Sequence, residues 1–469
     1  MSKRSVRRLL CAGALLCSAA AWAEQQPHIV YILADDLGWK DVGYHGGRAG
    51  TPHLDRLAQQ GARLERFYVL PHSTPTRAAL LTGRYPMRYG LQTLSILPWN
   101  SYGIPSDERL LARALKEAGY YTAALGEWRL GHARKEFWPT GRGFDYFYGS
   151  LSALSDRFRK TNALGLPDWQ RNGKSLRQDG YATALVAAEA AALISRHDPK
   201  RPLFLYVALP APAAPYQAPR AYLDRYREVE PEDRRAYYAM ISALDDAVGG
   251  IVAALERRDM WNDTVLVFHS DNGGAVRNRF VTGDGDAATK VADNGPFRNG
   301  RGGLHEGAVR VVSFICAPTR IPPAIVTERI HVTDLYPTLL RLAGARLDPE
   351  SQVKPIDGID AWGAIAEGKP SERPEVLIDL QEFRGAILVG QWKLMVYAPL
   401  PARYELYNLQ DDPSEEDNRA EREPQKVQEL AARLNELAWE MAPSLYLVDL
   451  LRARQRDAPM VWGDNPVRP

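Results

Sequence analysis

The segment from His72 to Arg84 (HSTPTRAALLTGR) has the residue types of a reactive, anion-binding site. Ser73 precedes Pro75 by two positions and Arg77 by four. Proline suits the first helical position, because its missing N–H needs no partner there, so we expect Ser73 just before the start of a helix. The positive end of that helix and Arg77 would then surround the Ser73 side chain, which suits an anionic substrate.

Two pairs of oxygen-bearing side chains follow apolar runs. Asp35 and Asp36 form the first pair, and Asp271 and Asn272 form the second. Adjacent carboxylates repel each other unless a cation lies between them, and ligands bind at strand ends in open α/β sheets. Carboxylate and amide oxygens without a thiolate suit Ca²⁺ or Mg²⁺. The sequence therefore predicts a metal site, with solvated Asp-rich turns as the alternative.

The apolar runs themselves predict the elements that position these groups. Residues 28–34, 202–209 and 264–270 are almost continuously apolar, as in strands covered on both faces. Residues 181–196 and 232–257 have the length and periodicity of helices. The main part of the chain is therefore predicted to be α/β, with a large mixed, mostly parallel sheet flanked by helices.

The pattern changes near residue 370. Short strands are expected around 376–380, 385–389 and 392–397, followed by a charged helix over about 424–441. This predicts a smaller antiparallel sheet plus a helix, packed on the main domain. We therefore divide the chain into a signal peptide (1–23), an α/β catalytic domain (24–370) and a C-terminal α+β subdomain (371–469).

Residues 1–23 have the pattern of a secretory signal. Basic residues from Lys3 to Arg8 precede an apolar run over 9–20, and Ala21-Trp22-Ala23 is a small-x-small cleavage site. The apolar run is too short to span a bilayer well, so we expect no membrane span in the mature protein. The expected location is periplasmic or secreted.

Composition is that of an ordinary globular protein, with 469 residues, 45% hydrophobic and 25% charged. Removing the four basic residues of the signal, which has no acidic ones, takes the formal net charge from +2 to −2. Charge therefore gives no indication of a nucleic-acid partner. Cys316 is the only cysteine left after cleavage, so an intramolecular disulfide is excluded.

The Ser73 segment resembles the sulfatase signature, which reads Cys or Ser, any residue, Pro, Ser/Thr/Ala, Arg and then Leu-Thr-Gly. The resemblance extends over nearly the whole mature chain, and the order of motifs is most similar to the arylsulfatase B (N-acetylgalactosamine 4-sulfatase) type. Motifs that carry it include Ala34–Trp39, Thr51–Asp55, Gly141–Asp145, Ser270–Gly274, Glu306–Arg310, Asp334–Leu340 and Glu405–Leu409.

The resemblance implies an alkaline-phosphatase-like fold and a defined chemistry. One Ca²⁺ would touch residue 73, and Arg77 would steady that residue. A formylglycine-generating enzyme would oxidise Ser73 during export, and a hydroxyl of the hydrated aldehyde would attack the sulfur of an aryl sulfate or a sulfated sugar. The implied calcium ligands are Asp35, Asp36, Asp271 and Asn272.

The sequence departs from the family at the acid/base positions. Glu127 stands where the family has Lys, and Arg129 stands where it has His, in Gly126-Glu-Trp-Arg-Leu-Gly131. A second His position falls near Ala213, and a second Lys position at or near Arg301. Arginine is always protonated near neutral pH and cannot act as a base. Each lost acid or base typically lowers the rate by about 10²–10⁴-fold.

Three hypotheses stay open at this point. The first is a sulfate-ester hydrolase that uses formylglycine from Ser73 with an altered acid/base set, which includes Arg77, Glu127, Arg129 and Arg301. The second is a catalytically degenerate protein that binds Ca²⁺ and a sulfated ligand. The third is a phosphoester hydrolase using unmodified Ser73, for which a second metal with His ligands would be needed. A further match to the signature core, Cys316-Ala-Pro-Thr-Arg320, lacks Leu-Thr-Gly, and we interpret Cys316 as a buried core thiol.

Overall fold

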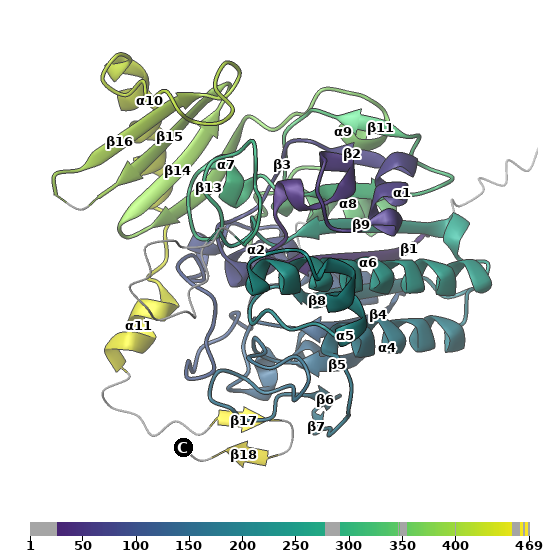
Figure 1. The fold of residues 1–469 in the computed structure, drawn as a ribbon. Helices are drawn as coiled ribbons and strands as arrows, with labels where there is room; N and C mark the ends of the chain where they lie inside the picture. The colour runs from purple at the N-terminus through teal and green to yellow at the C-terminus, as the bar shows by residue number, and fades with distance from the viewer. Residues whose placement is uncertain are drawn as a thin grey trace, which may run out of the picture.

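The computed structural model describes residues 26–276, 291–345, 347, 354–398, 400–452, 460–462 and 465–467. The predicted signal peptide lies outside these residues. A ten-stranded sheet with the order β11-β2-β10-β9-β1-β8-β4-β5-β6-β7 forms the centre of the molecule (Figure 1). Its strands are β1 His28–Asp35, β2 Ala62–Leu64, β4 Tyr121–Glu127, β5 Tyr146–Ser150, β6 Gln170–Arg171, β7 Lys174–Ser175, β8 Leu203–Pro212, β9 Thr264–Ser270, β10 Ser313–Cys316 and β11 Ala324–Val326.

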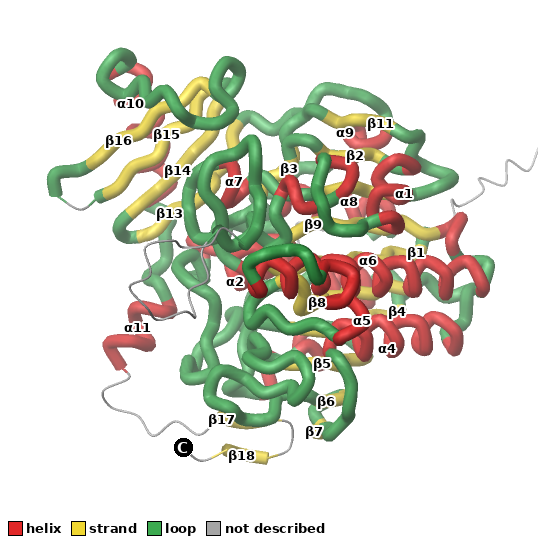
Figure 2. Tube along the Cα trace, viewed as in Figure 1, coloured by secondary structure: helices red, strands yellow, loops and turns green. Residues whose placement is uncertain are grey.

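The three apolar runs form the middle of this sheet. β1 pairs in parallel with both β8 and β9, with Leu33 opposite Ala208 and His269, and Ala34 opposite Ser270. The carboxyl ends of β1 and β9 therefore lie side by side. Loops gather at the end of the sheet where β1 finishes (Figure 2). The prediction of a mixed, mostly parallel sheet is confirmed.

Alternate residues of β1 pack into two separate cores. Ile29, Tyr31 and Leu33 face helices α2 (Ser73–Thr82), α3 (Leu111–Glu117) and α8 (Leu335–Leu342). Val30 and Ile32 face α1 (Pro52–Gln60), α4 (Ala182–Arg196) and α6 (Glu232–Arg257). Figure 1 shows α4 and α6 side by side across the near face of the sheet. Both faces are thus covered, which explains the continuous apolar runs.

Among the described residues, one helix, α6, is long and apolar enough to cross a membrane. However, 83% of its most apolar window is buried inside the molecule, as in a core helix of a globular domain. The periodic apolar stripe of this helix accounts for that burial.

Helix α2 begins at Ser73, two residues before Pro75, where the sequence predicted its start. His72 is the N-cap and Ser73 is the first helical residue, so Pro75 occupies the third position. The first N–H groups of a helix have no intrahelical partner, so proline is tolerated at any of these positions. Thr76 Oγ1 accepts from the Leu70 N–H (3.1 Å) and donates to the Leu70 carbonyl (3.0 Å), which fixes the entry of the chain.

The C-terminal part contains the expected antiparallel sheet, in the order β13-β14-β15-β16. Its strands are Glu375–Gln381, Arg384–Val389, Trp392–Tyr397 and Arg403–Asn408, and α10 (Pro424–Ala438) packs on β14 and β15. The sheet is joined to the main part by a buried ion cluster, in which Lys393 Nζ lies 2.9 Å from Glu306 and 2.8 Å from Glu415. The remaining elements are β3 Phe67–Tyr68, β12 Ile330–His331, β17 Met460–Trp462, β18 Asn465–Val467, α5 Arg220–Leu223, α7 Glu306–Val309, α9 Trp362–Ala366 and α11 Leu445–Arg452.

Candidate active site

Three carboxylates converge where β1 and β9 end. One oxygen from each of Asp35, Asp36 and Asp271 lies within 4.8 Å of the others, and all three side chains are buried. Asn272 Nδ2 donates to Asp36 Oδ1 at 2.6 Å, and Ser73 Oγ donates to Asn272 Oδ1 at 3.4 Å. The parallel pairing of β1 and β9 thus brings together all the oxygen ligands that the sequence predicted, with Ser73 beside them.

This oxygen set fits a hard divalent cation. Asp35 is fully buried, and its Oδ1 has no hydrogen-bond partner. Burial raises the pKa of the Asp35 carboxyl well above its usual value, and the nearby Arg129 opposes this only in part. A bound cation would provide the missing partner for Oδ1 and favour the ionised form. The all-oxygen chemistry favours Ca²⁺ or Mg²⁺ over softer metals.

Each of the three carboxylates also has a guanidinium partner. Arg77 Nη2 lies 3.1 Å from Asp271 Oδ2. Arg301 contacts Asp36, and Arg129 Nη2 contacts Asp35. Arg301 is the outermost of the three, with 27% of its side chain exposed. The site therefore contains fixed cations in addition to its potential metal ligands.

Arg129 also reaches Ser73. Its Nη1 donates to Ser73 Oγ at 3.0 Å, and Ser73 is fully buried. The backbone of Arg129 is left-handed (φ 58°), and its carbonyl accepts a hydrogen bond from Thr74 Oγ1 at 2.7 Å. A left-handed conformation is unfavourable for a residue with a side chain and persists where surrounding contacts enforce it. The contact with α2 therefore fixes Arg129 over Ser73.

Glu127, at the end of β4, is held between arginines. Its Oε2 accepts from Arg129 Nε at 2.7 Å, and its Oε1 accepts from Arg157 Nη1 at 2.7 Å. Although burial raises the pKa of Glu127, the guanidinium groups of Arg129, Arg157 and Arg77 lower it further, to about 2. The carboxyl group is therefore ionised at neutral pH and has no proton to donate to a substrate.

Gly126 positions this part of the strand. A Cβ at this residue would lie 1.9 Å from the Ala208 carbonyl oxygen of the neighbouring strand β8, and its φ is +93°. Only glycine fits this close approach in this backbone conformation. The strand can therefore turn at residue 126 and direct Glu127 and Arg129 into the site.

Arg157 was not identified from the sequence. It lies in the polar stretch 150–180, and its side chain is fully buried. Its Nη2 donates to the carbonyls of Ala213 (3.0 Å) and Ala214 (3.1 Å), which links Glu127 to the segment where the family has its second His. In the sequence, only Glu127 indicated that such a partner exists, because a carboxylate that is buried requires a cation beside it.

Two histidines close in sequence to the site residues, His132 and His305, have partners elsewhere. His305 Nε2 pairs with Glu405 at 3.2 Å, and His132 Nε2 bonds the Pro98 carbonyl at 3.0 Å. The Ser73 hydroxyl has contacts with Arg129 and Asn272 only, among the residues that the structure describes. Neither the Arg129 guanidinium nor the Asn272 amide titrates near neutral pH.

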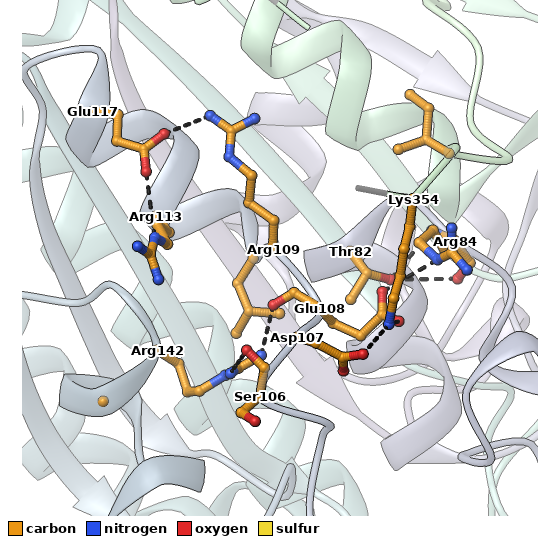
Figure 3. Close-up of a pocket in the computed structure, with 13 residues that line it drawn as sticks. Thr82, Arg84, Ser106, Asp107, Glu108, Arg109, Arg113, Glu117, Arg142 and Lys354 are labelled. Atoms are coloured by element: carbon orange, nitrogen blue, oxygen red, sulfur yellow. Dashed lines mark hydrogen bonds and ion pairs between the residues drawn. The ribbon is translucent and has the colours of Figure 1, made fainter. Parts of the chain in front are cut away.

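A second charged pocket, of about 290 Å³, lies beyond the other end of α2, next to Thr82 (Figure 3). Its charged side chains pair with one another: Arg109 Nη2 lies 2.6 Å from Glu117, and Lys354 Nζ lies 2.7 Å from Glu108. We interpret this pocket as a structural ion-pair cluster between α3 and the segment around residue 354.

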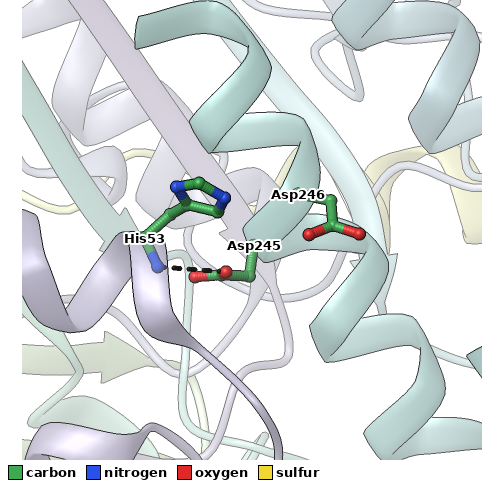
Figure 4. A group of neighbouring side chains, drawn as sticks. All are labelled: His53, Asp245 and Asp246. Atoms are coloured by element: carbon green, nitrogen blue, oxygen red, sulfur yellow. Dashed lines mark hydrogen bonds between the residues drawn. The ribbon is translucent and has the colours of Figure 1, made fainter. Parts of the chain in front are cut away.

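His53, Asp245 and Asp246 form a group that could also hold a metal by proximity (Figure 4). Asp245, however, accepts from the backbone N–H groups of His53 (3.1 Å) and Leu54 (2.8 Å), at the start of α1. These are N–H groups that a helix leaves unpaired. Asp245 thus caps α1 from α6, which is a structural role.

Cys316 lies in β10 and is a buried free thiol, as predicted. Burial raises its pKa to about 11. No helix follows it directly in the described chain, so its surroundings differ from those of Ser73 at the start of α2.

Comparison with known proteins gives one consistent result. The family model named Sulfatase matches residues 27–345. The chain is 33% identical to arylsulfatase J of Mus musculus over 93% of this chain and 80% of that protein, and 34% identical to N-acetylgalactosamine-6-sulfatase of Canis lupus familiaris over 82% and 74%.

Comparison with solved structures gives matches that agree with the sequence comparison. The crystal structure of Ps i-CgsB, also solved in complex with k-i-k-neocarrahexaose, matches with a TM-score of 0.80 at 30% identity, over 92% of this chain and 98% of that one. The phosphonate monoester hydrolase of Agrobacterium radiobacter matches with a TM-score of 0.63 at 19% identity, over 89% and 96%, which supports the fold alone.

Proposed function

Because this chain belongs to the sulfatase family of sulfuric ester hydrolases, we propose that Ser73 carries its nucleophile after oxidation to formylglycine. The observation that supports this most directly is the position of Ser73. It is the first residue of α2, its Oγ is 3.0 Å from the Arg129 guanidinium, and it lies beside the Asp35, Asp36 and Asp271 cluster.

The oxidation removes two hydrogen atoms from the Ser73 side chain, and we assign it to a formylglycine-generating enzyme acting during export to the periplasm or the exterior. A hydroxyl of the hydrated aldehyde would attack sulfur while the bond from sulfur to the ester oxygen breaks and the alcohol leaves. The sulfated diol would then expel sulfate and regenerate the aldehyde. The helix N-terminus and the Arg129 guanidinium would hold the sulfate oxygens by charge-assisted hydrogen bonds. Arg301, at the more exposed edge of the site, would contact the incoming anion first.

We assign one Ca²⁺ to this site. Asp35, Asp36, Asp271 and Asn272 would be its protein ligands, and the unpartnered buried Oδ1 of Asp35 supports this choice. When bound, the ion supplies positive charge to the sulfate oxygens and to residue 73. Arg77, bonded to Asp271 and to the Glu127 carbonyl at 2.7 Å, would keep these ligands in place.

The substrate class is an aryl sulfate or a sulfated sugar. The names of the relatives support both, since one is an arylsulfatase and another is an N-acetylgalactosamine-6-sulfatase. The ionised Glu127 and the always-protonated Arg129 provide no acid of suitable pKa for the leaving oxygen. We therefore favour aryl sulfates, because a phenolate leaves without a proton more readily than an alkoxide does.

A second candidate is a catalytically degenerate protein that binds Ca²⁺ and a sulfated ligand. One observation favours it: Ser73 is fully buried beneath Arg129, which is itself only 4% exposed. Such a site could hold an anion near Arg301 without turning it over. The phosphoester hypothesis gains no such support, because the 19% identical phosphonate hydrolase shares only the fold.

Peptide mass analysis of the exported protein, combined with 4-nitrophenyl sulfate turnover, tests the proposal. We expect a loss of two hydrogens on the peptide that contains Ser73, an unchanged mass for the peptide that contains Cys316, and no turnover in Ser73→Ala. An unmodified Ser73 without turnover, in a protein that Ca²⁺ still stabilises, would overturn the hydrolase in favour of the binding protein.

A further inference from the structure

We infer that Arg129 is a built-in competitor for the cation site: its guanidinium contacts the Asp35 carboxylate and opposes the binding of a divalent ion there until it turns away. This inference rests on the proposed Ca²⁺ site. It adds a property that comes from this chain's own Arg129, which stands where the family has a histidine.

The contacts of Arg129 make the competition direct. Its Nη2 bridges Asp35 Oδ2 and Glu127 Oε2, and its Nη1 donates to Ser73 Oγ at 3.0 Å. A calcium ion would need oxygen ligands at about 2.3–2.6 Å. A guanidinium nitrogen on the same carboxylate would then lie against the ion, and two cations at that separation repel each other.

With Asp35 ionised, the carboxylates and the guanidinium groups of the site balance one another in charge. Four buried carboxylates, Asp35, Asp36, Asp271 and Glu127, face the four guanidinium groups of Arg77, Arg129, Arg157 and Arg301. Neutralised carboxylates attract a divalent ion less strongly than free ones. The only described acceptor in this cluster that is both buried and without a partner is Asp35 Oδ1, beside the oxygen that Arg129 contacts.

Arg129 differs from the other buried arginines of the site in its bonding partners. Arg77 and Arg157 are fully buried and bond backbone carbonyls as well as carboxylates. Arg129 bonds Glu127 through both Nε (2.7 Å) and Nη2 (2.6 Å), so it can release Asp35 and still keep an ion pair. Glu127 is therefore a positioning residue, which retains the guanidinium near the site in either state.

Two states of the site follow from this geometry. In one, Arg129 covers Ser73 and satisfies Asp35. In the other, a divalent ion occupies the carboxylates, and Arg129 turns toward Glu127 and uncovers residue 73. If the first state holds about 90% of the metal-free molecules, the apparent calcium affinity falls about tenfold. Calcium would then control both the access of substrate to Ser73 and the positive charge beside this residue.

Calcium titration followed by calorimetry tests this inference without any activity measurement. The variants are Arg129→Gln, the double variant Glu127→Gln/Arg129→Gln, and Arg134→Gln, whose side chain is 68% exposed, as the matched control. The double variant keeps the net charge of the wild type, because it removes one carboxylate together with one guanidinium group. We expect Arg129→Gln and the double variant to bind Ca²⁺ at least about tenfold more tightly than the wild type, and Arg134→Gln to match the wild type.

The possible outcomes distinguish a failure of this inference from a failure of the proposed metal site. Equal and measurable calcium affinity in the wild type and both Arg129 variants would overturn the competition while leaving the metal site intact. If neither Arg129 variant binds Ca²⁺, the proposed metal site fails together with the competition. Adding Asp35→Asn to the Arg129→Gln variant should abolish its tight binding, and retention of that binding would place the ion elsewhere and overturn the inference.

Discussion

Arg157 Nη1 lies 2.7 Å from Glu127 Oε1, and both side chains are completely removed from solvent. The two residues are far apart in the sequence and come from different elements, the end of β4 and the 150–180 stretch. A buried carboxylate is tolerated only with a close cation and further hydrogen bonds. The change to Glu at position 127 and the presence of Arg157 thus form one structural unit.

Removal of Arg157 should destabilise the protein strongly. Arg157→Met leaves Glu127 with one guanidinium fewer and the Ala213 and Ala214 carbonyls without a donor, so we expect a loss of about 3–5 kcal/mol in the free energy of unfolding. Urea unfolding measures this. Arg159→Met, at an exposed neighbouring position, should change it little, and Glu127→Gln/Arg157→Met should recover part of the loss. An Arg157→Met protein as stable as its Arg159→Met control would contradict the structural unit.

Acid should remove the stability that Glu127 provides. Its pKa is lowered from 4.5 to about 2 in the folded protein, so the ionised form is favoured by folding. The contribution is complete above the unfolded value of 4.5 and disappears as the pH falls from there to about 2. The free energies of unfolding of wild type and Glu127→Gln should therefore converge over this interval. A difference that stays constant with pH would show that Glu127 does not titrate in this way.

The rate of ester cleavage should depend steeply on the leaving group. Without a general acid, the leaving oxygen departs as an anion, so the rate should fall as the pKa of the leaving alcohol rises. The loss of acid catalysis lowers the rate by about 10²–10⁴-fold, and this effect is largest for sugar sulfates. A series of substituted phenyl sulfates, compared with a sulfated monosaccharide, measures this dependence. A flat dependence would indicate that a group outside those in contact with Ser73 supplies a proton.

The attachment of the C-terminal sheet should depend on Lys393. This fully buried ammonium group lies between Glu306 and Glu415, at 2.9 and 2.8 Å. Lys393→Met would leave the Glu306 and Glu415 carboxylates facing each other, with the Arg310 guanidinium, 3.6 Å from Glu306, as a more distant cation. We therefore expect the free energy of unfolding to fall by about 3–5 kcal/mol. Lys369→Met, whose side chain is 68% exposed, is the matched control in the same denaturation experiment. Similar stability of the two variants would refute a role for the buried cluster in this attachment.

Local patterns in the sequence were sufficient to predict the central strands, the long helices and the pairs of oxygen-bearing side chains at the strand ends. The apolar runs indicated β1, β8 and β9, and the spacing of apolar residues indicated α6 at Glu232–Arg257. Because ligands bind where the strands of such a sheet end, Asp35 and Asp271 were expected to share one site from the sequence pattern alone. The predicted start of α2 was wrong by two residues, since proline is accepted at several positions of the first turn.

The roles of the substituted residues, in contrast, depend on the tertiary structure. Sequence reasoning placed Glu127 in an altered acid/base set, and it had no means of finding Arg157, because nothing local marks a loop arginine as buried. Only the folded chain brings Arg157 to Glu127, Arg129 to Asp35 and Ser73, and Arg301 to Asp36. Ion pairs between distant segments depend on side-chain reach and burial. Both are properties of the assembled fold, which leave no periodicity or spacing in the sequence.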